Sequence, residues 1–357
     1  MSRSSRADYS TVDTHENRRW TVAAPFFTDE QASWIVEEGV PYGENEFAFA
    51  RRSTPIGSWH ERSKQTSSIM DWLGYRRHAH NALSTEADGY IALFPQLAAT
   101  LGSQMRLRRD GSPLISWFFN TTLHGGGRAR SAKAALSRVD RFVVHSTVEI
   151  DGYARDLDLP KDRFEFVPLQ YGGTLSHAPR PDGEPYLFAT GSGFRDYGTM
   201  FAAVKKLNYR TLVLAGPRAL AGLEVPANVE IIESMPKAEI HQHVLHAKAN
   251  VLPLSGEGLT AGLVTIVEAF RHGRSMVGTH HVGVEDYLTD EDTGLLAAPG
   301  DVDGLAQRLE AMWTDRQLRE RLDSNAAQFG DKHCTDAAAS ASLLEIIARE
   351  TGLSKAA

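Results

Sequence analysis

The chain has 357 residues, which is more than one ordinary compact domain contains and fits two domains of average size. Hydrophobic residues make up 42% and charged residues 23% of the sequence, close to globular averages, so a mainly disordered protein is excluded. Lys and Arg number 38 against 45 Asp and Glu, a net charge of −7. Because no overall positive field exists to hold a phosphate backbone, nucleic-acid binding is not expected.

The single cysteine, Cys334, excludes an intramolecular disulfide and leaves a zinc site without a second thiolate. Residues 1–19 are polar and lack an apolar run of signal-peptide length. No later stretch approaches the roughly 20 apolar residues that span a membrane. These features predict a cytoplasmic protein in which residues 1–18 form a disordered tail.

The first half of the chain alternates short apolar runs with helical patterns. Strands are expected at residues 20–27, 46–50, 89–94, 113–119, 141–145 and 163–168, and helices at 96–101, 129–136 and 148–157. Strands that are apolar throughout, with helices between them, indicate a parallel sheet covered on both faces. Residues 51–84 are charged and irregular, and no element is predicted there. Residues 19–172 are therefore expected to form an N-terminal α/β domain.

A proline-containing segment without periodicity, residues 173–185, is the predicted linker. Beyond it, strands are expected at residues 186–190, 210–215, 229–232, 249–254, 275–278 and 294–297, and helices at 197–207, 237–247, 264–272 and 303–314. Residues 186–330 thus form a second α/β domain, and a C-terminal helix within 331–357 is expected to pack back on the first. Two such domains place a cleft where the carboxyl ends of their strands face each other.

A glycine-rich loop between the expected strand 249–254 and the next helix is the most informative segment. Backbone N–H groups in the first turn of a helix attract phosphate. A diphosphate site is therefore predicted at Glu257, Thr260, Gly262, Leu263 and Val264. Glu268, within the helix, can accept two hydroxyl hydrogen bonds, as from a ribose. An ordinary strand-to-helix turn with a surface glutamate is the alternative interpretation.

This segment resembles the donor site of GT-B glycosyltransferases, specifically the retaining family known as group 1 or family 4. In that family, a Glu is followed by seven residues and a second Glu. Glu268-Ala269 and the turn at 273–277 match the pattern, whereas Thr260 stands where the first Glu would. Glu257 lies three residues earlier. The resemblance implies that the first acid contacts the donor sugar.

Other segments occur in the order that the resemblance requires. Residues 140–146 and 164–172 resemble the end of the family's first domain, and residues 281–301 resemble its closing segment. The loop Gly191-Ser192-Gly193-Phe194-Arg195 resembles the phosphate loop of the donor domain, where the family uses an Arg and a Lys. Arg195 matches the Lys approximately, and Ser192 stands at the Arg position. Such a cation stabilises the charge that the leaving nucleoside diphosphate gains.

The resemblance implies an α/β fold of the GT-B type, in which two Rossmann-like parallel-sheet domains face a cleft. Residues 19–172 would bind the acceptor, and residues 186–330 would bind the nucleotide-sugar donor.

A second glycine-rich loop follows the strand expected at 113–119 and reads His124-Gly125-Gly126-Gly127-Arg128. Glycines allow a backbone to approach a ligand closely. His124 is predicted to contact the transferred sugar or to orient the acceptor hydroxyl, and Arg128 to contact phosphate. A loop in which the glycines only provide mobility is the alternative.

No metal site and no other cofactor is predicted. The Asp-x-Asp pairs at 156–158 and 301–303 lie beside expected helices, where Asp301 is the natural cap. The histidines at 241, 243 and 246 are interpreted as surface residues. Aromatic residues at 26–36 and the arginines at 106–109 offer a patch for peripheral contact with the inner face of a membrane, although core aromatics and a solvated basic turn are favoured.

Together these features predict a hexosyltransferase that moves a hexose from a nucleoside diphosphate sugar to an acceptor hydroxyl, on a saccharide or a lipid-linked saccharide. Arg195, Glu268 and His124 are the predicted catalytic residues. The resemblance implies retention of configuration, with the leaving diphosphate assisting deprotonation of the acceptor. Two alternatives stay open: a non-catalytic nucleotide-binding, glycan-binding or partner protein of the same fold, and a sugar-nucleotide epimerase.

Overall fold

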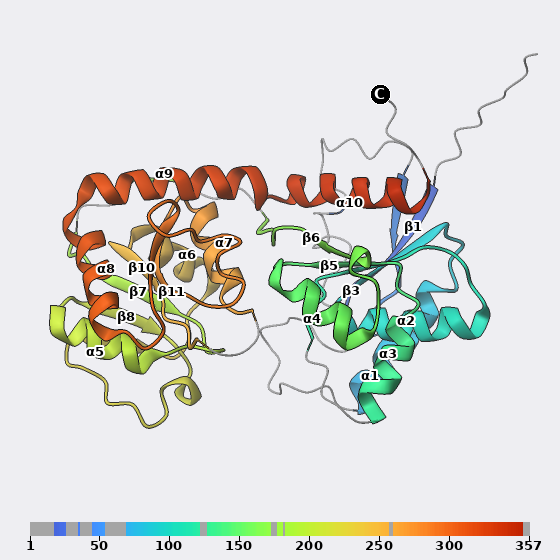
Figure 1. Ribbon diagram of the computed structural model, residues 1–357, viewed down its shortest axis with the longest axis horizontal. Helices are drawn as coiled ribbons and strands as arrows, with labels where there is room; N and C mark the ends of the chain where they lie inside the picture. Colours follow the sequence, from blue (N-terminus) through green and yellow to red (C-terminus); the bar gives the residue numbers. More distant parts are fainter. Residues whose placement is uncertain are drawn as a thin grey trace, which may run out of the picture.

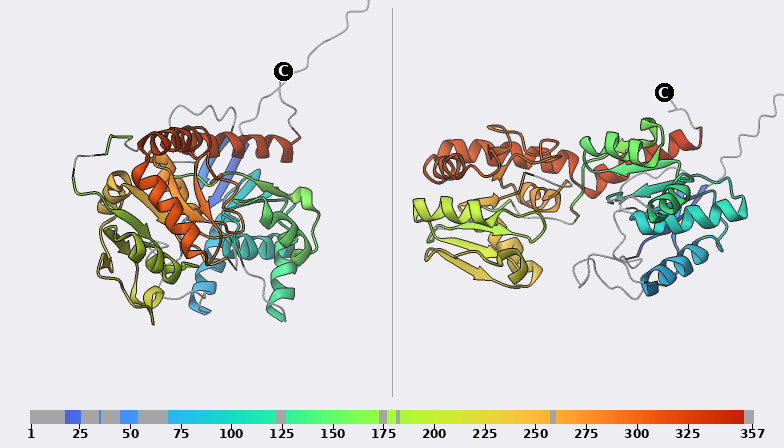
Figure 2. Two further views of the ribbon diagram at one scale, coloured as in Figure 1. Left: turned by 60° about the vertical axis from the view of Figure 1, so that its left-hand side comes forward. Right: turned by 60° about the horizontal axis from the view of Figure 1, so that its bottom comes forward.

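The computed structural model describes residues 18–25, 35, 45–53, 69–121, 127–172, 177–180, 183–256 and 260–352. Within these residues the strands form two six-stranded sheets, and every strand pair is parallel. The two sheets belong to two α/β domains that lie side by side (Figures 1 and 2). The predicted fold class is therefore confirmed.

The N-terminal sheet has the strand order β2-β1-β3-β4-β5-β6. Its strands are β1 (Arg18–Ala23), β2 (Asn45–Phe49), β3 (Gly89–Leu93), β4 (Leu114–Trp117), β5 (Arg141–Val144) and β6 (Phe164–Phe166). Its helices are α1 (Ile69–Ala82), α2 (Pro95–Arg108), α3 (Gly127–Leu136) and α4 (Val148–Leu157), with a 3₁₀ turn, η3 (Lys161–Arg163).

The C-terminal sheet has the order β12-β11-β10-β7-β8-β9. Its strands are β7 (Leu187–Thr190), β8 (Thr211–Leu214), β9 (Val229–Ile232), β10 (Ala249–Leu252), β11 (Met276–Thr279) and β12 (Gly294–Ala297). Its helices are α5 (Tyr197–Leu207), α6 (Lys237–His246), α7 (Leu263–Arg271), α8 (Val302–Thr314) and α9 (Arg316–His333), with a 3₁₀ turn, η4 (Pro217–Leu220). The last helix of the chain is α10 (Asp336–Glu350).

Alternate residues of the buried strands enter cores on opposite faces of each sheet, as a period of two requires. In β3, Tyr90 and Ala92 join the core beneath α1 and α2, whereas Ile91 and Leu93 join the core on the other face. Because both faces are covered, these strands are apolar at every position rather than at every second one. This explains why continuous apolar runs marked the strands in the sequence.

Helix α10 covers the second face of the N-terminal sheet, although it is the last helix in the chain. Its residues Leu343, Ile346 and Ile347 share a core with strand residues of that sheet. Arg141 on β5 binds Glu350 through Nη2 to Oε1 at 2.5 Å. In Figure 1, α9 lies over the C-terminal domain and α10 continues across to the N-terminal domain. The chain therefore connects the domains twice, once through residues 167–186 and once between α9 and α10.

Several element boundaries differ from the sequence expectations. Arg18, expected in the tail, is the first residue of β1, while residues 1–17 lie outside the described part. The domain end expected at residue 330 falls inside α9, which continues to His333. The helix expected at 96–101 extends from Pro95 to Arg108, because Leu101 and Met105 continue its buried face past the predicted end.

Helix α1 was not predicted, and its residues lie in the charged stretch 51–84. It buries Tyr75, Ala79 and Ala82, which recur at helical spacing. Two alanines give a weak hydrophobic signal, and Met70, Trp72 and Leu73 are exposed, so the pattern was obscured.

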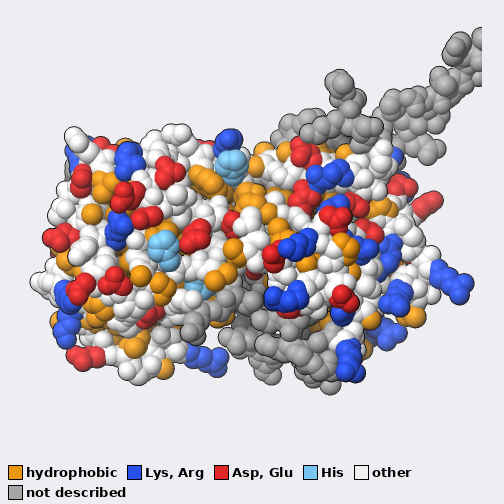
Figure 3. Space-filling view, viewed as in Figure 1, with side chains coloured by type: hydrophobic (Ala, Val, Ile, Leu, Met, Phe, Trp, Pro, Cys, Tyr) orange, Lys and Arg blue, Asp and Glu red, His pale blue; other side chains and the backbone are white. Residues whose placement is uncertain are grey.

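Acidic and basic side chains are interspersed over the face of the molecule in Figure 3. This mixture agrees with the modest net charge of −7. Among the described helices, none is both long enough and apolar enough to cross a membrane.

Candidate donor-binding site

The C-terminal sheet has a topological switch point between β7 and β10. From β7 the chain proceeds outward through β8 and β9, and then returns to place β10 on the other side of β7. In open parallel sheets, ligands bind outside the carboxyl ends of the strands at such a point. The two loops that leave β7 and β10 there are the two that the sequence predicted to bind the donor.

These two loops are joined by backbone hydrogen bonds. Asp196 N donates to Pro253 O at 2.9 Å, and Ser255 N donates to Phe194 O at 3.0 Å. Asp196 then caps α5 by accepting a hydrogen bond from Thr199 N at 3.0 Å. The loop after β7 is therefore held in place from both sides.

Arg195 connects the loop after β7 to the first turn of α7. Its Nε donates to Thr190 O at 3.1 Å, Nη1 to Gly193 O at 2.9 Å, and Nη2 to Thr265 Oγ1 at 3.1 Å. A guanidinium has five N–H donors, so two remain beyond these three bonds to described residues. Gly191 has φ 106°, a backbone conformation that other residues rarely adopt, and a Cβ built there would lie 2.5 Å from Arg195 Nη2. Of the predicted residues, Gly191, Gly193 and Arg195 are thus brought together.

Helix α7 begins after Gly262, and its first residues are Leu263 and Val264. The first N–H groups of a helix have no partner within it and carry its positive dipole end. Because Thr265 in this first turn contacts Arg195, the guanidinium and the helix N-terminus form one positively polarised region. Gly262, Leu263 and Val264 directly precede Thr265, the residue of this segment that Arg195 contacts.

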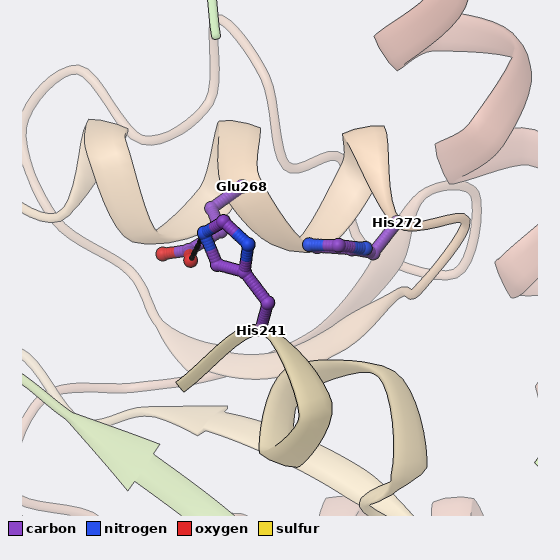
Figure 4. A group of neighbouring side chains, drawn as sticks. All are labelled: His241, Glu268 and His272. Carbon is purple, nitrogen blue, oxygen red and sulfur yellow. Dashed lines mark ion pairs between the residues drawn. The ribbon is translucent and has the colours of Figure 1, made fainter. Parts of the chain in front are cut away.

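Glu268 lies one turn further along α7, on the face that carries Thr265. It is buried, and its Oε1 accepts a hydrogen bond from the Tyr171 hydroxyl at 3.2 Å. His241 Nε2, on α6, is also 3.2 Å from Oε1 (Figure 4). Burial raises the pKa of Glu268, while the hydrogen bond from Tyr171 and the charge of Lys237 oppose the rise.

The Tyr171, His241 and Glu268 side chains form a closed network. Tyr171 Oη is 2.8 Å from His241 Nε2. Burial and Lys237 lower the pKa of His241, which favours its neutral form at pH 7. If Tyr171 donates to Glu268, the proton of neutral His241 belongs on Nε2, because it can then donate to Tyr171. His241 was interpreted as a surface residue from the sequence; it is half-buried and takes part in this network.

His241, Glu268 and His272 are the one group of potential metal ligands identified within the described residues. Their ligand atoms lie within 4.8 Å of one another. Glu268 and His272 are four residues apart on α7 and therefore share a face (Figure 4). Within this group, His241 and Glu268 contact each other and Tyr171 directly.

The carboxyl ends of the two sheets face each other across a polar contact. Asp286, which follows β11, accepts hydrogen bonds from Ser146 Oγ at 2.7 Å and from Thr147 N at 2.9 Å, at the start of α4. Tyr287 Oη donates to His145 O at 2.7 Å. Asp286, from the C-terminal domain, thus accepts hydrogen bonds at the N-terminus of α4 in the N-terminal domain. Helix α4 has no side-chain cap from its own N-cap residue.

The carboxyl ends of β3 and β4 carry aromatic side chains in strained backbone positions. Phe94, after β3, has φ 73°, and Phe118, after β4, has φ 55°. Bulky residues rarely adopt the left-handed region, and such strain concentrates at ligand sites. The two rings stack with centroids 5.4 Å apart, and the His145 ring lies 5.2 Å from Phe118.

The remaining predicted residues are placed as follows. Thr260 is buried and follows the part of the loop that the structure does not describe. Ser192 is exposed. Glu257 and the N-terminal-domain residues His124, Gly125 and Gly126 lie outside the described residues, as does the side chain of Arg128.

Sequence reasoning missed four residues that structure this site: Thr265, Tyr171, His241 and Asp286. Each acts through a contact far away in sequence. Tyr171 and Glu268 are 97 positions apart, and Ser146 and Asp286 are 140 apart. The Gln170-Tyr171-Gly172 exit from the first domain was recognised as a segment, but nothing local indicated the partner of the tyrosine.

Residues 199–329 match the family model of glycosyl transferases group 1. This match begins within α5, ends within α9 and includes Thr260, helix α7 and Glu268. The match to this family thus lies within the C-terminal domain. No curated protein sequence matches the chain.

Solved glycosyltransferase structures share the fold over both domains. Sucrose-phosphate synthase from Thermosynechococcus elongatus superposes with a TM-score of 0.70 at 13% identity, covering 94% of this chain and 100% of that one. A glycosyltransferase from Rickettsia africae gives 0.65 at 10% identity, covering 95% and 100%. HepE of Anabaena, in complex with UDP-glucose, gives 0.66 at 11% identity, covering 93% and 100%. The chain therefore has the GT-B fold, and the group 1 match supports glycosyl transfer as its general activity.

Proposed function

We propose that the protein transfers a hexose from a nucleoside diphosphate sugar to an acceptor hydroxyl on a saccharide or lipid-linked saccharide, with retention of configuration. The observation that carries this proposal is the contact between Arg195 and Thr265. It unites the loop after β7 and the N-terminus of α7 into one site for a diphosphate. HepE, which shares the fold, was solved in complex with UDP and with UDP-glucose.

In this proposal the diphosphate receives hydrogen bonds from the two remaining donors of Arg195 and from the first N–H groups of α7. The negative charge on the leaving diphosphate grows as the glycosidic bond breaks. A fixed guanidinium and helix dipole therefore stabilise the transition state more than the ground state. In this proposal these groups, rather than a metal, stabilise the negative charge of the leaving group.

Glu268 is proposed to bind the ribose. Thr265 contacts the diphosphate-binding Arg195, and Glu268 follows it on the same face of α7. Binding a ribose requires the carboxylate form, whose remaining lone pairs accept the two hydroxyl protons. Tyr171 and His241 hold the carboxyl group in place while leaving Oε2 for the ligand.

The acceptor is proposed to bind on the N-terminal side of the cleft, beside the stacked rings of Phe94 and Phe118. Aromatic side chains with a few polar groups are typical linings of ligand sites. The leaving diphosphate takes the acceptor proton as the new glycosidic bond forms, so a protein base is not required. Closing of the domains excludes water, which would otherwise hydrolyse the donor.

The proposal is tested by titrating UDP and GDP calorimetrically into the wild type and into Arg195→Met. The matched control is Arg218→Met, which alters an exposed arginine on η4 of the same domain. Loss of charge-assisted hydrogen bonds predicts about tenfold weaker diphosphate binding in Arg195→Met and no change in the control. Equal affinities in the wild type and Arg195→Met would contradict the proposed diphosphate site.

A further inference from the structure

Three side chains in the C-terminal domain offer the ligands that a transition-metal ion prefers. His241 belongs to α6, Glu268 to α7, and His272 directly follows α7. One ligand atom of each lies within 4.8 Å of those of the other two. Two imidazoles and one carboxylate, with a further position left for water, are a donor set that zinc uses in proteins. The group therefore has the chemistry of a metal site.

The backbone places two of these ligands on the same face of a helix. Glu268 and His272 are four residues apart, and the backbone N–H of His272 donates to Glu268 O at 3.1 Å. Residues at this spacing lie one above the other, as the two histidines of zinc-binding helices do. In Figure 4, the His241 ring extends from α6 toward this face of α7. The neighbouring helix thus supplies the third ligand.

The distances within the group suit a small ion. Zinc bonds of about 2.0–2.2 Å at tetrahedral angles place neighbouring ligand atoms about 3.4 Å apart. His241 Nε2 and Glu268 Oε1 are 3.2 Å apart. The rings of His241 and His272 have centroids 5.1 Å apart and are inclined by 59°, so they do not stack face to face. Side-chain rotation that brings the most distant pair about 1.4 Å closer completes the arrangement.

Burial and charge determine how strongly this group attracts a cation. Glu268 is 7% and His272 4% exposed, whereas the side chain of His241 is 23% exposed, which leaves a path for an ion from one side. A buried carboxylate attracts a cation more strongly than a carboxylate in water does. Lys237 contributes an opposing positive charge, which acts on both Glu268 and His241. Removing this charge should therefore strengthen the binding of a cation.

We propose that His241, Glu268 and His272 bind a divalent transition-metal ion such as zinc, and that the bound ion excludes the nucleotide. Each neutral imidazole binds the ion through one nitrogen and keeps its proton on the other. Glu268 is the carboxylate assigned to the ribose, so the exclusion of the nucleotide rests on the proposed function. The ion and the nucleoside diphosphate then compete for one carboxylate, and each lowers the apparent affinity for the other.

The metal site is tested without nucleotide, by titrating Co²⁺ into tag-free protein and recording its visible absorption. The wild type is expected to bind one Co²⁺ per chain. His272→Gln removes one ligand but no group assigned to the nucleotide, and it should weaken cobalt binding by at least about tenfold. The matched control His246→Gln, on α6 but outside the group, should bind as the wild type does. Mg²⁺, which prefers oxygen ligands, should not displace Co²⁺.

Two further variants keep this test decisive if His272→Gln does not fold. His241→Gln alters a half-buried ligand and should weaken cobalt binding to a similar extent. Lys237→Met removes the opposing charge and should strengthen it. Cobalt binding that is absent from the wild type, or that is unchanged in the variants of His241 and His272, would overturn the inference.

Competition is measured by titrating UDP and GDP calorimetrically into the wild type and His272→Gln, with and without Co²⁺. Because diphosphates also bind cobalt in solution, both proteins are compared at the same metal concentration. Cobalt at about ten times its dissociation constant for the wild type should weaken nucleotide binding about tenfold in the wild type, beyond the effect in His272→Gln. Equal weakening in the two proteins would overturn the exclusion. If neither nucleotide binds the metal-free wild type, the proposed function and the exclusion both fail, while the cobalt titration still decides the metal site.

Discussion

The clearest energetic consequence of the structure concerns the stability of Glu149→Gln as a function of pH. Burial raises the pKa of Glu149 from 4.5 to about 7, with Asp286 adding to the rise and Thr260 opposing it. The tyrosines 153 and 287 also lie near this carboxyl group. A carboxylic acid whose pKa is higher in the folded than in the unfolded protein is destabilising above the unfolded pKa, because unfolding allows it to ionise.

The magnitude follows from the difference between the two pKa values. A rise from 4.5 to about 7 is 7 − 4.5 = 2.5. At about 1.4 kcal/mol per unit, this corresponds to about 3 kcal/mol of unfolding free energy. The loss begins as the pH rises above 4.5 and is complete above about 7. Glutamine does not titrate, so the stability of Glu149→Gln relative to the wild type should increase by about 3 kcal/mol between about pH 4 and pH 8.

Thermal unfolding followed by circular dichroism at these two pH values measures this change. With about 2–4 °C per kcal/mol for domains of this size, the relative Tm of the variant should rise by roughly 6–12 °C from the lower to the higher pH. Any fixed cost of introducing the amide cancels in this comparison. The exposed control Asp151→Asn should show no such rise. A Tm difference between Glu149→Gln and the wild type that is the same at both pH values would refute the reasoning.

Two further predictions concern catalysis and the role of the last helix. Arg195→Ala should lower kcat more than it weakens acceptor binding, because the charge that Arg195 meets is largest as the bond breaks; equal losses in steady-state kinetics would indicate a structural role. Leu343→Ala should lower the unfolding free energy by about 3 kcal/mol in denaturant titrations, because Leu343 is fully buried between α10 and the N-terminal sheet. The exposed control Ala341→Ser should change it little, and an equal effect of the two substitutions would contradict the packing of α10.

The fold could be predicted largely because both sheets are covered on two faces. Strands such as β3 and β10 are apolar at every position, and the helices between them have ordinary lengths. The start of α7 could also be predicted from the local sequence, because a glycine-rich loop after a buried strand is a short-range feature. Strand order is not local, however. That the loops after β7 and β10 are neighbours follows from the return of the chain across the sheet.

The parts of the site that sequence reasoning missed are those that depend on this long-range arrangement. Tyr171 and His241 resemble ordinary linker and surface residues until α6, α7 and the exit from the first domain are placed together. Glu149 occupies the first turn of a helix, where an acidic residue is common for dipole reasons alone. Only its burial distinguishes it from Asp151 on the same turn.

The central claim is that the C-terminal domain binds a nucleoside diphosphate through Arg195, the N-terminus of α7 and Glu268. The most direct test is a thermal-shift screen of UDP, GDP, ADP, CMP and dTDP on the wild type and on Glu268→Ala. A ligand that binds only the folded state raises the midpoint of unfolding. The account predicts that at least one nucleoside diphosphate stabilises the wild type and that this stabilisation is lost in Glu268→Ala. Stabilisation of both proteins to the same extent, or of neither by any nucleotide, would contradict it.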